Sequence, residues 1–362
     1  MNLERTPSRP PKIAPLPAGT ERPLFSVMIP TYNCTQYLIR TIKSVLQQDM
    51  GEDLMQIEVI DDYSTDADVE GIVNAIGNGR VMYYRQAQNV GSLRNFETCI
   101  NRATGEYVHI LHGDDMVHNG FYKEIEDLFR TFPRIGAAFT DFYYMNEGDA
   151  YIKKDAKLLH EPGILQDWNL YIASKQRVQP PAMVVKRSVY EHLGSFYAVH
   201  YGEDWEMWNR IAANYDVAHS PKMLASYRVH ENNISTHSLL SGKNIKDIKT
   251  VIDIIQQYLP DGEKKRIGRE AKRNFANYYC KAAHRMYSDF YNQKAALVQA
   301  NESLKLSFNR TTMMAAIKLY SKIAIGHNRK RNVYEPYVTQ RRLSEGLLKG
   351  LNGVKPWNVI SD

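Results

Sequence analysis

The chain has 362 residues, of which 43% are hydrophobic and 24% charged, and its formal net charge is +6 at pH 7. A chain of this length can bury a full core in more than one domain, and the composition is that of an ordinary globular protein. Its sequence has no apolar run long enough to cross a bilayer, and residues 1–22 lack the apolar centre of a signal peptide, which argues against a membrane-spanning or exported protein.

The three cysteines are Cys34, Cys99 and Cys280. They form no CxxC pair and are odd in number, which argues against a disulfide framework and against a zinc site. We therefore expect a protein of the reducing cytoplasm.

Proline is concentrated at the start of the chain, where Pro7, Pro10, Pro11, Pro15 and Pro17 occur among scattered basic residues. This stretch lacks the apolar periodicity of a folded element. We predict that residues 1–23 are a flexible leader.

After residue 24, short apolar runs typical of strands alternate with segments in which apolar residues recur at helical spacing. Short connections separate them, which indicates an α/β fold with a mostly parallel sheet and helices on both faces. In chain order, we predict strand 25–29, helix 38–46, strand 57–60, helix 72–76, strand 81–84, helix 93–103, strand 107–111, helix 121–132 and strand 137–143.

Three of these strands end in polar clusters: residues 30–33 (PTYN), residues 61–62 (DD) and residues 114–115 (DD). Each cluster by itself could be a turn or a helix cap. In an open α/β sheet, however, ligands bind beyond the carboxyl ends of the strands. If the three strands are neighbours, their clusters line one crevice.

The side chains in these clusters suit a nucleotide diphosphate. Tyr32 could stack on a base, and Asp62 could accept a hydrogen bond from a ring N–H such as N3 of uracil or thymine. Asp115, beside Asp114, could hold Mg²⁺ or Mn²⁺, because hard oxygen ligands suit these ions. Arg94 could add positive charge against phosphate or ribose, although a surface ion pair explains it equally well.

Further along, Gly202-Glu203-Asp204-Trp205 begins another predicted helix. Its acids could be simple N-terminal caps. Beside an activated substrate, a carboxylate here could act as a general base on an attacking hydroxyl. His230, which follows Arg228, could be a metal ligand, a contact for the leaving phosphate or a hydrogen-bonded loop histidine.

With these residues in view, residues 24–240 resemble the family 2 glycosyltransferases of GT-A fold. The order and spacing of the matching motifs make the resemblance specific. They are 27–33 (VMIPTYN), 59–66 (VIDDYSTD), 89–91 (NVG), 94–97 (RNFE), 103–108 (ATGEYV), 113–115 (GDD), 202–210 (GEDWEMWNR) and 227–230 (YRVH).

The resemblance implies an inverting, metal-dependent transfer of a sugar from a UDP- or dTDP-type donor to a hydroxyl of a glycan or lipid-linked acceptor, in cell-surface polysaccharide synthesis. Asp204 matches the catalytic base, and Asp115 matches the residue that binds Mn²⁺ or Mg²⁺, with His230 as a further candidate ligand. Glu203, Trp205 and Arg228 are expected in supporting roles. The expected donor-binding residues are Pro30, Thr31, Tyr32, Asn33, Asp62, Asn89, Gly91, Arg94 and Asp114.

This sequence departs from the family pattern at two points. His112 stands where many relatives carry an acid, so fewer carboxylates are available and the choice of metal is open. The glutamine-and-tryptophan motif of processive polysaccharide synthases is also missing, which favours the addition of one sugar at a time.

Residues 241–362 are predicted to form a helical C-terminal region, with apolar helix faces over 245–255, 267–287 and 313–323. Between Arg310 and Lys349, nine lysines and arginines stand against Glu335 and Glu345. A solvated helical face would explain this charge. We expect instead a peripheral contact of residues 310–349 with the inner face of the cell membrane, near a lipid-linked acceptor, and no nucleic-acid partner.

Two other functions are compatible with parts of the sequence. A phosphotransferase could use the carboxylates at 61–62 as nucleophile, although the usual D-x-D spacing is absent there. A sugar-nucleotide- or polysaccharide-binding protein could keep the fold without transfer. The presence of both Asp115 and Asp204 favours the enzyme.

Overall fold

The computed structural model describes residues 4–154, 158–230, 233–288 and 290–326. The chain divides into two compact units. The first contains residues up to 143, 157–172 and 176–228, and the second contains residues 144–156, 173–175 and those from 229 onwards. The first unit therefore ends at Arg228, whereas the sequence placed the domain boundary at residue 240.

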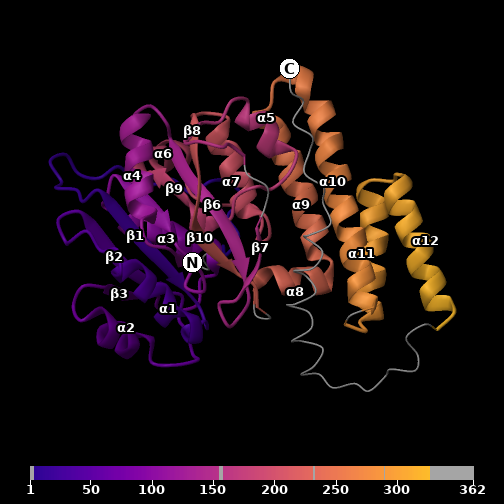
Figure 1. The fold of residues 1–362 in the computed structure, drawn as a ribbon, viewed down its shortest axis with the longest axis horizontal. Coiled ribbons are helices and arrows are strands. Elements are labelled where there is room, and N and C mark those ends of the chain that lie inside the picture. The colour runs from indigo at the N-terminus through magenta and orange to yellow at the C-terminus, as the bar shows by residue number, and fades with distance from the viewer. Residues whose placement is uncertain (1–3, 155–157, 231–232, 289, 327–362) are drawn as a thin grey trace. The chain divides into compact units, whose positions relative to one another are not determined.

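The first unit is built on a sheet in which β3 (Met82–Arg85), β2 (Met55–Asp61), β1 (Phe25–Thr31) and β4 (Tyr107–Ile110) are neighbours in that order. These four strands are parallel, and β1 and β2 are paired so that Thr31 lies opposite Asp61. Figure 1 shows β1, β2 and β3 side by side. Two of the predicted polar clusters therefore follow neighbouring strand ends at the same edge, as expected.

The sheet continues from β4 through β9 (Met183–Lys186), β6 (Ala137–Met145), β10 (Val217–Arg228) and β5 (Met116–Val117). Here β9 is antiparallel to both β4 and β6, and β10 is antiparallel to β5 and to the short β8 (Gly163–Ile164). The α/β class is confirmed, and the antiparallel pairs lie in the half of the sheet beyond β4.

Helices with one apolar face cover this sheet, as their helical spacing of buried residues requires. Helix α3 (Ser92–Arg102) packs against β1, β2 and β4, while α1 (Thr35–Leu46) packs against α2 (Val69–Gly77) and β5. Further helices of the first unit are α4 (Phe121–Thr131), α6 (Arg187–Leu193) and α7 (Glu203–Ala212), together with α5 (Trp168–Ala173) and the 3₁₀ turn Pro180–Ala182.

The proline-rich leader differs from the prediction that it is flexible. Its described part, from Glu4 on, lies against the first unit: Ile13 is buried, and the Ser195 N–H donates to the carbonyl of Pro11 at 2.8 Å. Arg22 donates to the carbonyls of Thr104 and Gly105. Proline lacks an N–H but keeps its carbonyl, so an extended proline-rich segment can accept hydrogen bonds from a surface although it forms no core of its own.

The second unit is mainly helical, with β7 (Tyr151–Lys154) as its strand. Its helices are α8 (Ile234–Ser241), α9 (Lys243–Ile255), α10 (Asp261–Ser288), α11 (Gln293–Leu306) and α12 (Arg310–Ala324), and a 3₁₀ turn spans Gln256–Tyr258. Helix α10 packs against α9, α11 and α12 (Figure 1). Among the described residues, none of the helices combines the length and the apolar character that crossing a bilayer requires.

Candidate active site

The turn after β4 is held against the end of β1. The Leu111 N–H donates to the carbonyl of Met28, and the Gly113 N–H donates to the carbonyl of Pro30, both at 3.0 Å. A Cβ added at Gly113 would lie 2.7 Å from Oγ1 of Thr31, so the close approach of the two strand ends requires glycine here. Thr31 is buried in this contact, and it shapes the site rather than lying at its surface.

Two residues outside the turn fix the acids that follow. Thr41 on α1 donates from Oγ1 to the carbonyls of Gly113 and Asp115, at 3.0 and 2.8 Å. Arg228, the last residue of β10, donates from its backbone N–H to Asp115 Oδ1 at 2.8 Å and from Nε to the carbonyl of Asp114 at 2.7 Å. Arg228 therefore holds both acids in place, and its predicted supporting role in the reaction stays a prediction. Thr41 carried no sequence signal, because its partners are distant in the chain.

The second carboxylate oxygen of Asp115 identifies a place for a cation. Asp115 is fully buried, and within the described part of the chain its Oδ2 has no hydrogen-bond partner. Burial and the negative charge of Asp114 raise the pKa of Asp115 well above its usual range. A buried oxygen without a partner is costly unless an ion or a proton satisfies it.

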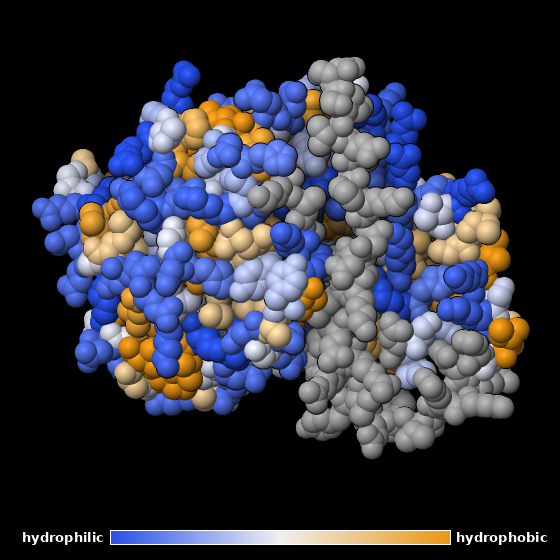
Figure 2. Space-filling model, viewed as in Figure 1, coloured by the Kyte–Doolittle hydropathy of each residue, from blue (hydrophilic) through white to orange (hydrophobic). Residues whose placement is uncertain are grey.

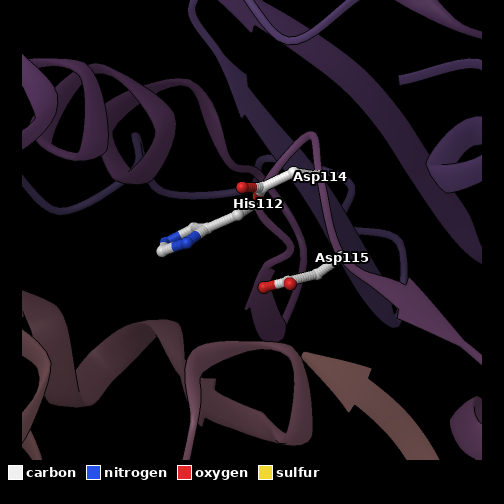
Figure 3. A group of neighbouring side chains, drawn as sticks. All are labelled: His112, Asp114 and Asp115. Carbon is white, nitrogen blue, oxygen red and sulfur yellow. The ribbon is translucent and has the colours of Figure 1, made fainter. Parts of the chain in front are cut away.

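His112 completes a group of three potential ligands with Asp114 and Asp115. Their ligand atoms lie within 4.8 Å of one another. Figure 3 shows the three side chains leaving the turn toward the same side. Burial lowers the pKa of His112, which favours the neutral imidazole that can bind a metal. The donor set therefore fits a divalent cation.

In the sequence, His112 stands out only as the position where many relatives carry an acid, and the structure adds a contact that orients it. Its ring stacks on Phe96 of α3, with centroids 5.1 Å apart and planes at 8°. This contact fixes the ring beside the two acids. The site therefore combines one imidazole with two carboxylates, a donor set that Mn²⁺ accepts more readily than Mg²⁺, which prefers oxygen ligands.

On the predicted donor side, Asp62 organises the loop that contains Asn89 and Gly91. Its Oδ2 accepts from the Gly91 N–H and from Nδ2 of Asn89, both at 2.9 Å, and its Oδ1 accepts from the Val90 N–H at 2.7 Å. Burial raises the pKa of Asp62, while these bonds and the charge of Arg5 act in the opposite direction. The predicted residues Asp62, Asn89 and Gly91 are thus brought together by direct bonds.

Hydrogen bonds join the loop after β1 to the loop after β2. Asn33 donates from its N–H to Ser64 Oγ at 3.0 Å and accepts at Oδ1 from the Thr65 N–H at 2.8 Å. Tyr32, between Pro30 and Asn33, is 50% exposed, so its ring is available to stack on a ligand. Asn33 holds the loops together, and Tyr32 is free to face a base.

Arg94, also predicted on the donor side, is engaged with protein groups. Its Nη1 pairs with Glu97 Oε2 at 2.6 Å, and its Nε donates to the carbonyl of Glu4 at 2.8 Å. The ion-pair alternative therefore describes its contacts in this structure, and its predicted role toward phosphate or ribose stays a prediction.

Asp204 stands in the first turn of α7, which follows Gly202 at φ 89°. Its Oδ1 accepts from the Trp205 N–H at 2.7 Å, and its Oδ2 accepts from Nε2 of Gln176 at 2.6 Å. Burial raises the pKa of Asp204 to about 7 although these bonds lower it. A carboxyl group with that pKa can accept a proton near neutral pH. Gln176 was missed by the sequence analysis, since a lone glutamine in an irregular stretch carries no periodic signal.

Helix α7 is held firmly, which fixes the position of Asp204. Trp205 is completely buried and donates from Nε1 to the carbonyl of Ile172 at 2.8 Å. The buried pair Glu206–Arg210 is 3.0 Å long, and Arg210 also donates to the carbonyl of Ser195. Trp205 thus supports the site through packing.

Asp204 and His112 line one recess of the first unit. Its lining includes Glu203, Asp204 and His112 together with apolar side chains. The recess therefore places the candidate base beside His112, one of the three candidate metal ligands, from segments about 90 residues apart in the sequence. His230 belongs to the second unit, so its suggested part in metal binding stays a prediction.

The fold is that of the GT-A class. S. aureus TarS, residues 1–349, in complex with UDP-GlcNAc has a TM-score of 0.61 at 14% identity, over 86% of this chain and 93% of that one. The mannosyltransferase PcManGT from Pyrobaculum calidifontis, in complex with GDP-Man and Mn²⁺, has a TM-score of 0.52 at 18% identity, over 96% and 92%. At these identities, the likeness establishes the fold.

The family follows from the sequence comparison: residues 26–194 match the model of glycosyl transferase family 2, so the chain carries a family 2 glycosyltransferase domain. An uncharacterized glycosyltransferase of Mycoplasma genitalium is 32% identical over 127 residues, which are 34% of this chain and 41% of the relative. The minor teichoic acid biosynthesis protein GgaB of Bacillus subtilis is 30% identical over 108 residues, 29% of this chain and 12% of the relative. The resemblance predicted from the motifs is confirmed.

Proposed function

We propose that the chain transfers one sugar, with inversion, from a UDP- or dTDP-linked donor to a hydroxyl of a glycan or lipid-linked acceptor, using Mn²⁺ or Mg²⁺. The process would be cell-surface polysaccharide synthesis at the inner face of the cell membrane. The observation that carries the proposal is the shared recess: Asp204, with a pKa of about 7, and His112 line the same space, and the ligand atoms of Asp114 and Asp115 lie within 4.8 Å of that of His112.

Two neighbours support parts of this proposal. TarS was solved with UDP-GlcNAc, and PcManGT with Mn²⁺ and GDP-Man, which supports a nucleotide-sugar donor and a divalent metal here. The teichoic acid protein GgaB supports a cell-surface polymer as acceptor. The proposal of a uracil or thymine nucleotide, rather than another base, rests on Asp62 and on the exposed ring of Tyr32.

In the proposed reaction, Asp204 accepts the proton of the acceptor hydroxyl as that oxygen attacks the anomeric carbon of the donor. The bond from the anomeric carbon to the diphosphate breaks, and the nucleoside diphosphate leaves with the electron pair. His112, Asp114 and Asp115 would hold the cation, which supplies positive charge against the diphosphate. Inversion follows from attack on the face opposite the leaving group.

A panel of nucleotide sugars tests this function. The protein is incubated with UDP-, dTDP- and GDP-sugars in Mn²⁺, Mg²⁺ or EDTA, and slow donor hydrolysis is followed as released nucleoside diphosphate. We expect metal-dependent release from a UDP- or dTDP-sugar. If no nucleotide sugar binds in any of the three conditions, the proposed transferase is wrong.

Gln176 provides a prediction for the pH dependence of transfer. Its bond to Asp204 stabilises the charged carboxylate, so Gln176→Ala is expected to raise the pKa of Asp204 by roughly one unit beyond about 7. Because the base must be deprotonated, the rate falls below the pKa, and the acidic limb of the kcat/KM profile should move to higher pH. An acidic limb at the wild-type position would show that Gln176 does not act on the base.

For the C-terminal region, we propose a peripheral membrane contact through α12. Of the basic segment 310–349, residues 310–326 lie within the described part of the chain and residues 327–349 lie outside it. Met314 and Ile317 are 55% and 52% exposed, and Arg310 and Lys318 are exposed on the same helix. Figure 2 shows hydrophobic surface over α12. Apolar and basic groups exposed together on a helix suit an anionic membrane surface.

Vesicle co-sedimentation tests this contact with phosphatidylglycerol and phosphatidylcholine vesicles. The variant R310Q/K318Q/K322Q should bind phosphatidylglycerol vesicles about 100-fold more weakly, at roughly 1 kcal/mol for each charge. The control K264Q/K265Q/R266Q removes three charges from α10 and should bind like the wild type. If both variants bind phosphatidylglycerol vesicles equally well, α12 does not form the membrane contact.

A further inference from the structure

Residues 4–11, the N-terminal strap, contact the donor side of the first unit. Arg5 donates from Nη1 to the carbonyl of Asn89 at 3.2 Å and from Nη2 to Asn89 Oδ1 at 2.5 Å. Its guanidinium also covers Gly91, where an added Cβ would lie 3.3 Å from Arg5 Nε. The strap therefore brings a positive charge to the loop that is bonded to Asp62.

The strap also holds the loop that leads into α7. The Ala198 N–H donates to the carbonyl of Pro7 at 2.9 Å. Ala198 has φ 71°, in the left-handed region that residues with a Cβ seldom adopt, so this turn needs support from outside. The carbonyl of Pro7 supplies that support six residues before Asp204.

His200 joins the two contacts. Oγ1 of Thr6 lies 2.7 Å from His200 Nε2, and Oγ of Ser92, the first residue of α3, lies 3.3 Å from His200 Nδ1. The strap, the start of α3 and the loop before Asp204 are thus connected. The contacts of Thr6 and Pro7, which follow Arg5 in the chain, therefore help to hold Arg5 at a defined position beside Asn89.

Arg5 and Asp62 together offer a hydrogen-bond donor and an acceptor, which is the arrangement that would recognise the edge of uracil or thymine. Asp62 Oδ1 accepts one hydrogen bond, from Val90, and a carboxylate oxygen can accept about two. Arg5 has five N–H donors, and Asn89 takes two of them in the described structure. Uracil and thymine present a donor, N3–H, between two carbonyl acceptors. Cytosine presents an acceptor at N3, which a carboxylate would repel.

We propose that Arg5 is a specificity-determining residue for the donor base: it donates to O4 of uracil or thymine, the carbonyl oxygen that cytosine replaces with an amino group, while Asp62 accepts from N3–H. This inference rests on the proposed function and adds to it a role for the N-terminal strap in donor choice. Arg5 and Asp62 would contact the same base, because both are hydrogen-bonded to the loop that contains Asn89 and Gly91.

Calorimetric titration of the full chain with UDP, CDP and GDP in the presence of Mn²⁺ tests the proposal. We expect the wild type to prefer UDP, and Arg5→Ala to bind UDP roughly tenfold more weakly with no change for CDP. Arg9→Ala is the matched control, because it removes an exposed arginine from the same strap and should keep the wild-type preference. Both arginines are exposed, so both variants are expected to fold.

Three results would overturn the role of Arg5: an unchanged or tighter UDP affinity in Arg5→Ala, an equal loss for UDP and CDP, or a wild-type preference for CDP or GDP. An equal loss would mean that Arg5 acts on the diphosphate or on the loop in general. A wild-type protein that binds none of the three nucleotides, with or without metal, would instead contradict the proposed glycosyl transfer.

Discussion

Asp204→Asn is expected to lower kcat for transfer by about 10³-fold while leaving the affinity for the nucleotide donor within about twofold of the wild type. Asparagine keeps the acceptor for the Trp205 N–H and the shape of the side chain, but it cannot take a proton from the acceptor hydroxyl. Single-turnover transfer and calorimetric titration with UDP separate the two quantities. A loss confined to kcat is the signature of a group that acts in the transition state.

The structure also shows what Asp204→Asn must not disturb. Gln176 donates to the carboxylate now, and it can turn its amide so that Oε1 accepts from the new amide group, at the expense of its bond to the carbonyl of Val178. A small loss of stability is therefore expected. Asp127→Asn is the control for the same chemical change, because Asp127 is a half-buried acid on α4 that pairs with Lys123 and Arg130. If Asp204→Asn abolishes donor binding, the role of Asp204 is structural.

The wild-type pH profile belongs to the same experiment. With a pKa of about 7, Asp204 is mostly protonated below pH 6, so kcat should rise as the pH increases through 7 and then level. The Asn variant has no such group, and its residual rate should lack this limb.

The sequence could predict that the loops after β1 and β2 and the acidic turn after β4 lie at one edge of the sheet, because this placement follows from local rules. Buried apolar runs end in polar residues, and parallel strands place their carboxyl ends at one edge, so Thr31 and Asp61 had to be neighbours once β1 and β2 paired. The first four strands and the helices between them were predicted for the same reason: their periodicity is strong.

The antiparallel half of the sheet could not be predicted in the same way. Strand β10 contains Pro221 and polar residues at inward positions, such as the buried His219 and Ser226, so it does not read as a strand. Its stability comes from long-range pairing. Yet β10 supplies Arg228 to the acidic turn, so part of the site depends on an element that local patterns do not reveal.

Partners distant in sequence account for the other residues that the sequence analysis missed. Thr41 and Gln176 act through one or two hydrogen bonds to groups 28 to 74 positions away, and neither lies in a motif. The strap is a related case. Proline-rich composition correctly indicates that residues 4–11 build no core, but it does not indicate whether another surface accepts them.

Asp115→Asn is expected to abolish metal-dependent nucleotide binding and to lower metal-dependent donor turnover by roughly 10³-fold, since it removes a charged ligand from the candidate metal site. The same change should leave the apo protein as stable as the wild type or more so. The buried Oδ2 has no partner in the described chain, and a carboxyl with a strongly raised pKa costs free energy when it is charged at neutral pH.

Thermal unfolding with and without Mn²⁺ makes this test independent of activity. The wild type should gain Tm on addition of Mn²⁺, because a ligand that binds the folded state stabilises it, and Asp115→Asn should lose most of that gain. The sign of the apo difference follows from the raised pKa: between the unfolded value of 3.8 and the raised folded value, the folded wild type binds more protons, so its stability falls as the pH rises. Asp115→Asn has no titrating group at this position, so its stability relative to the wild type should increase as the pH rises. If Asp115→Asn keeps the full Mn²⁺-induced gain in Tm, the metal does not bind at Asp115. If the variant loses that gain and its apo Tm is at least as high as that of the wild type, the buried acid is retained for metal binding at a cost in stability.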